Sequence, residues 1–113
     1  MTKLYKEINQ DTSTALGKLR KDIPDVMSGL SALAQAATKE GALDKKTKEL
    51  IALALGVAAR CDGCIGSHAQ ILVKLGAKRE EVLEALGMAI YMGGGPSAVY
   101  ASYALSAFDE LSS

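Results

Sequence analysis

The sequence is poor in large aromatic side chains. Its 113 residues include no tryptophan and one phenylalanine, although 49% of them are hydrophobic. A core built from this chain must therefore use alanine, leucine, isoleucine, valine and methionine. Alanine and leucine are strong helix formers, and β-branched residues are few, so the composition predicts an all-α protein.

The chain also lacks net charge and long apolar segments. Thirteen basic side chains are matched by thirteen acidic ones along the chain, which argues against nucleic acid or an anionic membrane as the main partner. The longest apolar run, Leu50 to Ala59, is too short to cross a bilayer. Residues 1–7 have neither the apolar region nor the small-residue cleavage site of a signal peptide. We therefore expect a cytoplasmic protein.

The length and the residue spacing predict one domain, residues 1–113, of five or six helices. A chain of 113 residues can bury a single core, but it is small enough that oligomerisation would add to its stability. Helix boundaries are indicated by the apolar period and by proline, aspartate and glycine at the ends. The predicted helices are Lys3–Arg20, 24–40, Lys45–Ala59, 62–75, Lys78–Met92 and Pro96–Leu111. The first of them is weakened in its middle by the polar residues Asp11–Thr14.

Particular residues are expected to cap these helices or to pack between them. Asp22 and Asp44 are predicted N-caps of the second and third helices, and Gly76 is predicted to end the fourth. The second helix has an apolar face, and the fifth carries two methionines that we expect in the core. These apolar residues are Met27, Leu30, Leu33, Ala34 and Ala37 in the second helix, and Met88 and Met92 in the fifth.

Cysteine and histidine are rare, and they are concentrated in one segment. Both cysteines, Cys61 and Cys64, and the single histidine, His68, lie within eight residues of each other. Thiols separated by two residues can close a small disulfide. A histidine four residues after the second thiol can lie on the same helical face. In a cytosolic protein such thiols are usually catalytic, redox-sensing or metal-binding.

These residues predict peroxide chemistry at Cys64. A helix amino terminus and a neighbouring base both stabilise a thiolate, and His68 is placed to accept the thiol proton. Attack of the Cys64 thiolate on a peroxide oxygen would give a sulfenic acid, which Cys61 would resolve as a disulfide. Glu49 lies where the preceding helix changes from polar to apolar, so it is a candidate for orienting His68 or relaying its proton.

The spacing of these residues resembles that of a known family. The motif consists of Glu49, eleven residues, Cys61, two residues, Cys64, three residues and His68, followed later by Leu75–Ala77 and Met92–Pro96. It is similar to the alkylhydroperoxidase D-like branch of the carboxymuconolactone decarboxylase family. The resemblance implies an all-helical subunit in which the four motif side chains form a thiol peroxidase centre. It further implies a homo-oligomer, a trimer or a hexamer.

Two differences within that family bear on the chain. The member best known for peroxidase activity carries a further histidine between its cysteines, where this chain has Asp62 and Gly63. The decarboxylase branch generally lacks the paired cysteines, so their presence favours the redox branch. The expected partners are a hydroperoxide substrate and a dithiol or protein electron donor, and neither a cofactor nor a metal is expected.

Three further interpretations of the motif remain open. Cys61 and Cys64 could form half of a zinc site with His68 and Glu49, although structural zinc sites usually use two Cys/His pairs. A lyase or isomerase of a lactone-like metabolite could use His68 and Glu49 for proton transfer without the cysteines. A non-catalytic oligomeric module could use the disulfide to sense redox state.

Overall fold

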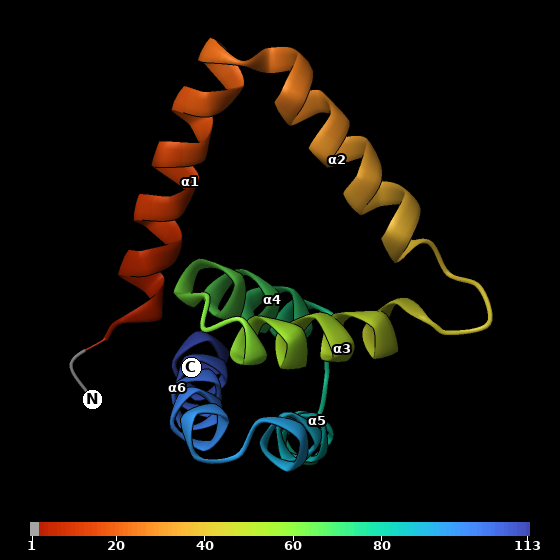
Figure 1. The fold of residues 1–113 in the computed structure, drawn as a ribbon, viewed down its shortest axis with the longest axis vertical. Helices are drawn as coiled ribbons and strands as arrows, with labels where there is room; N and C mark the ends of the chain where they lie inside the picture. The colour runs from red at the N-terminus through yellow and green to blue at the C-terminus, as the bar shows by residue number, and fades with distance from the viewer. Residues whose placement is uncertain (1–2) are drawn as a thin grey trace.

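Six α-helices account for almost all of residues 3–113, the part of the chain that the computed structural model describes (Figure 1). The all-α prediction is confirmed, and every predicted boundary lies within two residues of the observed one. The helices are α1 (Tyr5–Asp22), α2 (Pro24–Thr38), α3 (Lys45–Ala58), α4 (Asp62–Lys74), α5 (Arg79–Gly93) and α6 (Gly95–Ser112).

The first helix runs without a break through Asp11–Thr14, the stretch that the sequence predicts to be weak. The helix propensities of these polar residues are only slightly unfavourable, and tertiary packing overrides penalties of that size. Thr12 contributes to this packing, because a Cβ atom built on Gly63 of α4 would lie 3.5 Å from its hydroxyl oxygen. The polar stretch thus faces another helix as well as solvent.

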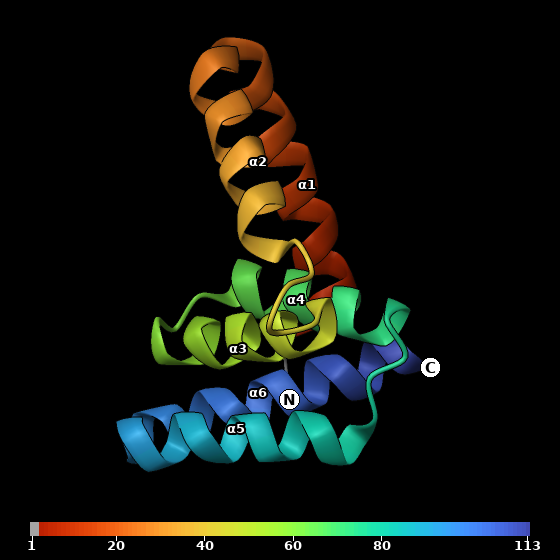
Figure 2. The same ribbon diagram turned by 90° about the vertical axis from the view of Figure 1, so that its right-hand side faces the viewer.

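Helices α3 to α6 form the body of the molecule, with α3 and α4 lying over α5 and α6 (Figure 2). Their buried faces meet in one core. Three alanines of α6 belong to it, and their small side chains let the neighbouring helices approach closely. The core residues of the body include Leu53 and Val57, Ile65, Ala69 and Leu72, Val82 and Leu86, and Ala101, Ala104, Ala107 and Phe108.

Helices α1 and α2 form an arm that projects from this body. They meet at the α1–α2 turn, far from the body, and move apart as they approach it (Figure 1). The arm leaves most of the predicted apolar face of α2 uncovered. Met27 is buried, whereas Leu30 and Leu33 are 54% and 64% exposed in the single chain. The expectation that Met88 and Met92 pack in the core is wrong, because α5 turns Val82, Leu86 and Ala89 inward and leaves both methionines outside.

The predicted helix caps are partly confirmed. Asp44 accepts a hydrogen bond from the Thr47 backbone N–H at 2.7 Å and caps α3. Gly76 ends α4 with a φ of +73°, a conformation that glycine adopts without strain. Asp22 does not cap α2, because α1 continues through it and Ile23 alone separates the two helices.

A test of the α1–α4 contact uses Gly66 of α4. A Cβ atom there would collide with the Asn9 side chain and lie 3.2 Å from the Tyr5 ring, both in α1. We expect Gly66→Ala to lower the free energy of unfolding by about 1–3 kcal/mol, as overpacking does. Urea unfolding followed by circular dichroism measures this change.

The matched control is Gly17→Ala in α1, where nothing lies within 4 Å of the added Cβ. This substitution should raise stability by up to about 1 kcal/mol, because alanine is the better helix former. If Gly66→Ala and Gly17→Ala shifted the unfolding midpoint in the same direction and by the same amount, close α1–α4 packing would be contradicted.

Candidate active site

The junction between α3 and α4 is a tight reversal that brings the cysteines to the start of a helix. Arg60 has a left-handed backbone conformation with a φ of 55°. The Cys61 N–H bonds back to the Gly56 carbonyl, and the Arg60 N–H to the Val57 carbonyl, each at 3.0 Å. Glycine usually occupies the left-handed position in such a helix ending. The reversal makes Cys61 the N-cap of α4.

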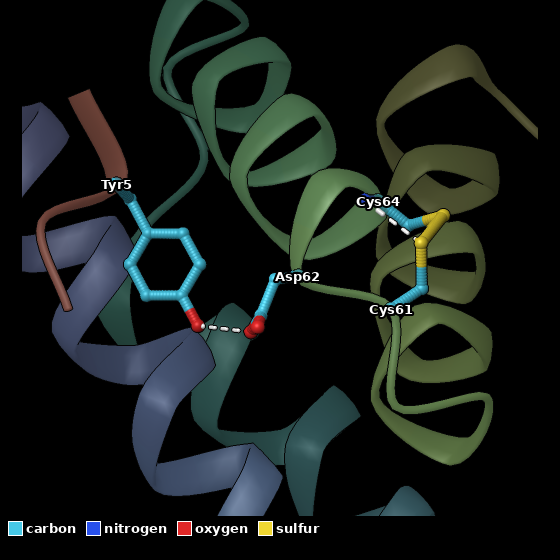
Figure 3. Close-up of a disulfide and its surroundings, with 4 residues drawn as sticks. All are labelled: Tyr5, Cys61, Asp62 and Cys64. Atoms are coloured by element: carbon cyan, nitrogen blue, oxygen red, sulfur yellow. Dashed lines mark hydrogen bonds between the residues drawn. A yellow bond between two sulfur atoms is a disulfide. The ribbon is translucent and has the colours of Figure 1, made fainter. Parts of the chain in front are cut away.

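The two cysteines are joined by a disulfide in the first turn of α4 (Figure 3). Their Cα atoms are 5.2 Å apart, and the Cys61 sulfur accepts a hydrogen bond from the Cys64 backbone N–H at 3.1 Å. Unpaired N–H groups at a helix amino terminus carry partial positive charge, which stabilises a thiolate there. The site can therefore hold both the disulfide and a reactive dithiol.

Gly56 allows α3 to lie close to this disulfide. A Cβ atom at Gly56 would be 3.2 Å from the Cβ of Cys64, which is closer than most side chains pack. Sequence reasoning missed this residue. Its signal was a single glycine inside an apolar helix, five residues before Cys61. A lone glycine in a helix is too common to mark a close helix contact by itself.

A hydrogen bond between α3 and α4 joins Glu49 to His68. The Nδ1 atom of His68 lies 2.8 Å from Oε1 of Glu49. Glu49 is only 1% exposed, because it shares the buried face of α3 with Leu53 and Val57. The His68 side chain is 30% exposed. When Nδ1–H donates to the carboxylate, the neutral ring keeps Nε2 free to accept a proton.

The four residues predicted from the motif are thus carried by α3, α4 and the reversal between them. Cys64 and His68 are one turn apart on α4, a separation at which side chains are neighbours on a helix surface. The structure brings Glu49 to His68 and Cys61 to Cys64. This arrangement can supply a thiolate, a proton acceptor and a carboxylate that orients the acceptor.

Asp62, between the cysteines, has partners that sequence reasoning missed. Its carboxylate accepts a hydrogen bond from the Tyr5 hydroxyl at 2.9 Å (Figure 3). It also accepts hydrogen bonds from the Lys3 ammonium at 2.9 and 3.1 Å. Burial favours the protonated acid, but the bonds from Lys3 and Tyr5 outweigh it and hold the pKa of Asp62 below its usual value. Burial and the bond to Asp62 raise the pKa of Tyr5, so its hydroxyl stays a neutral donor.

Metal-binding clusters and membrane-spanning helices are both absent from the described part of the chain. Within residues 3–113, no three histidine, cysteine or acidic side chains are grouped in a way that could hold a metal ion. None of the helices in the same range is long and apolar enough to span a membrane.

The fold and the site define an all-α protein with a Cys-x-x-Cys disulfide at a helix amino terminus. Residues 24–107 match the model of the carboxymuconolactone decarboxylase family. The chain therefore belongs to this family, and the family assignment predicted from the motif is confirmed.

Solved structures agree with this assignment. A carboxymuconolactone decarboxylase family protein from Legionella pneumophila is 64% identical, with a TM-score of 0.95 over 96% of this chain and 97% of that one. A family member from Thermotoga maritima is 31% identical, with a TM-score of 0.80 over 91% of this chain and 88% of that one. The Thermotoga protein is described as possibly involved in the antioxidative response.

A curated enzyme shares part of the chain. The alkyl hydroperoxide reductase AhpD of Mycobacteroides abscessus is 40% identical over 52 residues, which is 46% of this chain and 30% of that enzyme. The similarity to a peroxide-reducing enzyme is thus confined to one portion of each protein.

The Glu49–His68 hydrogen bond makes a testable contribution to stability. His68→Ala would leave a carboxylate buried without its partner, so we expect the free energy of unfolding to fall by about 1–3 kcal/mol at neutral pH. Denaturant unfolding of the reduced protein measures this change. Glu49→Gln in the same background removes the unpaired charge and should restore part of the loss. A loss that is unchanged in the double variant would contradict the pairing.

Proposed function

We propose that the protein is a thiol peroxidase or disulfide oxidoreductase. Its Cys61–Cys64 pair would be oxidised by an organic hydroperoxide and reduced again by a dithiol or a protein electron donor. One observation carries the proposal: a disulfide at the start of α4, followed one turn later by a histidine that bonds a buried glutamate. The partial match to AhpD and the description of the Thermotoga relative support the same chemistry.

The first step is attack of the Cys64 thiolate on the terminal oxygen of the hydroperoxide. The S–O bond forms as the O–O bond breaks, and the alcohol leaves after its oxygen takes up a proton. His68 accepts the Cys64 proton before this step and then returns it to the leaving oxygen. Glu49 holds the ring so that Nε2 is free for this transfer.

The second step closes the disulfide. The Cys61 sulfur attacks the sulfenic acid sulfur of Cys64, and water leaves with the Cys61 proton. The hydroperoxide has then received two electrons, which the thiol pair has lost. The donor restores both thiols by thiol–disulfide exchange and becomes a disulfide itself.

Oxidation of the reduced protein by cumene hydroperoxide tests the proposal. Two thiols should disappear, and mass spectrometry should find the loss of two hydrogen atoms in a peptide with an intramolecular Cys61–Cys64 link. Cys64→Ser should consume no peroxide, whereas Cys61→Ser should stop at a sulfenic acid that dimedone traps. His68→Asn should slow the reaction about 100-fold or more, as loss of a proton-transfer group does. Thiols that survive excess hydroperoxide would refute the peroxidase activity.

A second candidate function is favoured by the Glu49–His68 pair itself, which needs no sulfur for proton transfer. A lyase or isomerase acting on a lactone-like metabolite would keep its activity in a Cys61→Ser, Cys64→Ser double variant. The thiol peroxidase would lose all activity in that variant, so the same protein separates the two candidates.

We also expect the subunits to assemble as a trimer or a hexamer. Several large apolar side chains on α2, α3 and α5 are uncovered in the single chain, and contact between subunits would remove them from water. They include Leu30, Leu33, Leu55, Met88 and Met92, which are 54–79% exposed.

Light scattering after size-exclusion chromatography tests the assembly. We expect a mass of three or six subunits for the unmodified protein. Leu33→Lys combined with Met92→Lys should shift the population to smaller species, because charge is costly inside an apolar interface. Gln10→Lys adds one positive charge at an exposed polar position of α1 and should leave the mass unchanged. A monomeric unmodified protein would contradict the expectation.

A further inference from the structure

Asp62, the residue that follows Cys61, accepts hydrogen bonds from the amino-terminal segment of the chain. Asp62 is the first residue of α4, and its carboxylate points away from the disulfide toward Tyr5 (Figure 3). Oδ1 accepts the Tyr5 hydroxyl at 2.9 Å, and Oδ2 accepts the Lys3 ammonium at 2.9 Å. Both donors lie more than fifty residues before Asp62 in the sequence.

The amino-terminal segment is itself held by α6. The Glu110 carboxylate accepts the backbone N–H groups of Tyr5 and Lys6 at 2.8 and 2.9 Å, at the start of α1. The Lys3 ammonium lies over the Tyr103 ring, 4.5 Å from its centre. The Tyr5 side chain is fully buried. The donors to Asp62 therefore have little freedom to move.

The position of the Asp62 carboxylate matters because Asp62 and the reactive thiolate both lie at the amino terminus of α4. A free carboxylate in the first turn would also be attracted to the helix N–H groups and would repel a thiolate there. Lys3 balances its charge, and Tyr5 holds it on the side away from the sulfurs. Two other carboxylates of this region are engaged elsewhere: Glu49 with His68, and Glu110 with the start of α1.

We propose that Tyr5 and Lys3 are positioning residues that raise the reduction potential of the Cys61–Cys64 pair by holding the Asp62 carboxylate away from it. The dithiol form is favoured when its thiolate has no uncompensated negative neighbour. The inference rests on the proposed thiol–disulfide exchange, but it does not depend on which oxidant the protein uses.

The test is equilibration with glutathione. In the exchange, two glutathione thiols reduce the protein disulfide and become glutathione disulfide, so the ratio of protein forms gives the potential. Tyr5→Phe should lower the equilibrium constant for reduction of the protein about threefold to tenfold, which is about 15–30 mV toward more negative potential. Lys3→Met should shift it in the same direction, and Asp62→Asn in the opposite direction.

A double variant distinguishes positioning from packing. Tyr5→Phe should have no further effect in the Asp62→Asn background, because no carboxylate charge remains to be held. An equal shift in that background, or no shift with either Tyr5→Phe or Lys3→Met, would overturn the proposal. Lys3 is partly exposed, so Lys3→Met decides the matter if Tyr5→Phe does not fold.

The control is Tyr91→Phe, which removes a hydroxyl from a side chain that is 78% exposed and should leave the potential unchanged. The measurement uses no hydroperoxide. A protein that exchanges with glutathione but does not consume hydroperoxide would refute the peroxidase step, and the shifts in potential would still decide the roles of Tyr5 and Lys3.

Discussion

The close contact between α3 and α4 is the constraint on which the rest of the site depends. Gly56 lets the two helices approach at Cys64, and the hydrogen bond from His68 to Glu49 joins them further along. The left-handed Arg60 closes the connection in so few residues that Cys61 becomes the N-cap of α4. A looser connection would separate the sulfurs from the helix end that stabilises a thiolate.

The same contact explains why a carboxylate can be almost fully buried. An isolated buried carboxylate is costly, and a hydrogen-bonded partner offsets most of that cost. Glu49 finds this partner in His68, whose ring remains partly exposed on the other side. The pair therefore connects the interior of the body with the surface. In the proposed reaction, Glu49 holds the His68 ring in place while the exposed side of the ring exchanges a proton with the reacting group.

A second set of polar contacts ties the start of the chain to the start of α4. Asp62, Tyr5 and Lys3 meet there, and Glu110 of α6 holds the backbone of Tyr5. In this way hydrogen bonds join three segments that are far apart in sequence, and Figure 3 shows the Tyr5–Asp62 contact among them. We propose that Tyr5 of α1 and Lys3, which precedes α1, hold the Asp62 carboxylate away from the sulfurs.

The sequence by itself determined the helices and the reactive motif, because both depend on residues close together in the chain. Capping by Asp44, termination at Gly76 and the Cys61–Cys64 spacing are local features. Only the tertiary structure decided which faces are covered and which distant side chains meet. Met88 lies outside because α5 turns its other face inward, and Tyr5 reaches Asp62 because α1 packs on α4. Local periodicity does not encode such contacts, since they depend on how whole helices are placed.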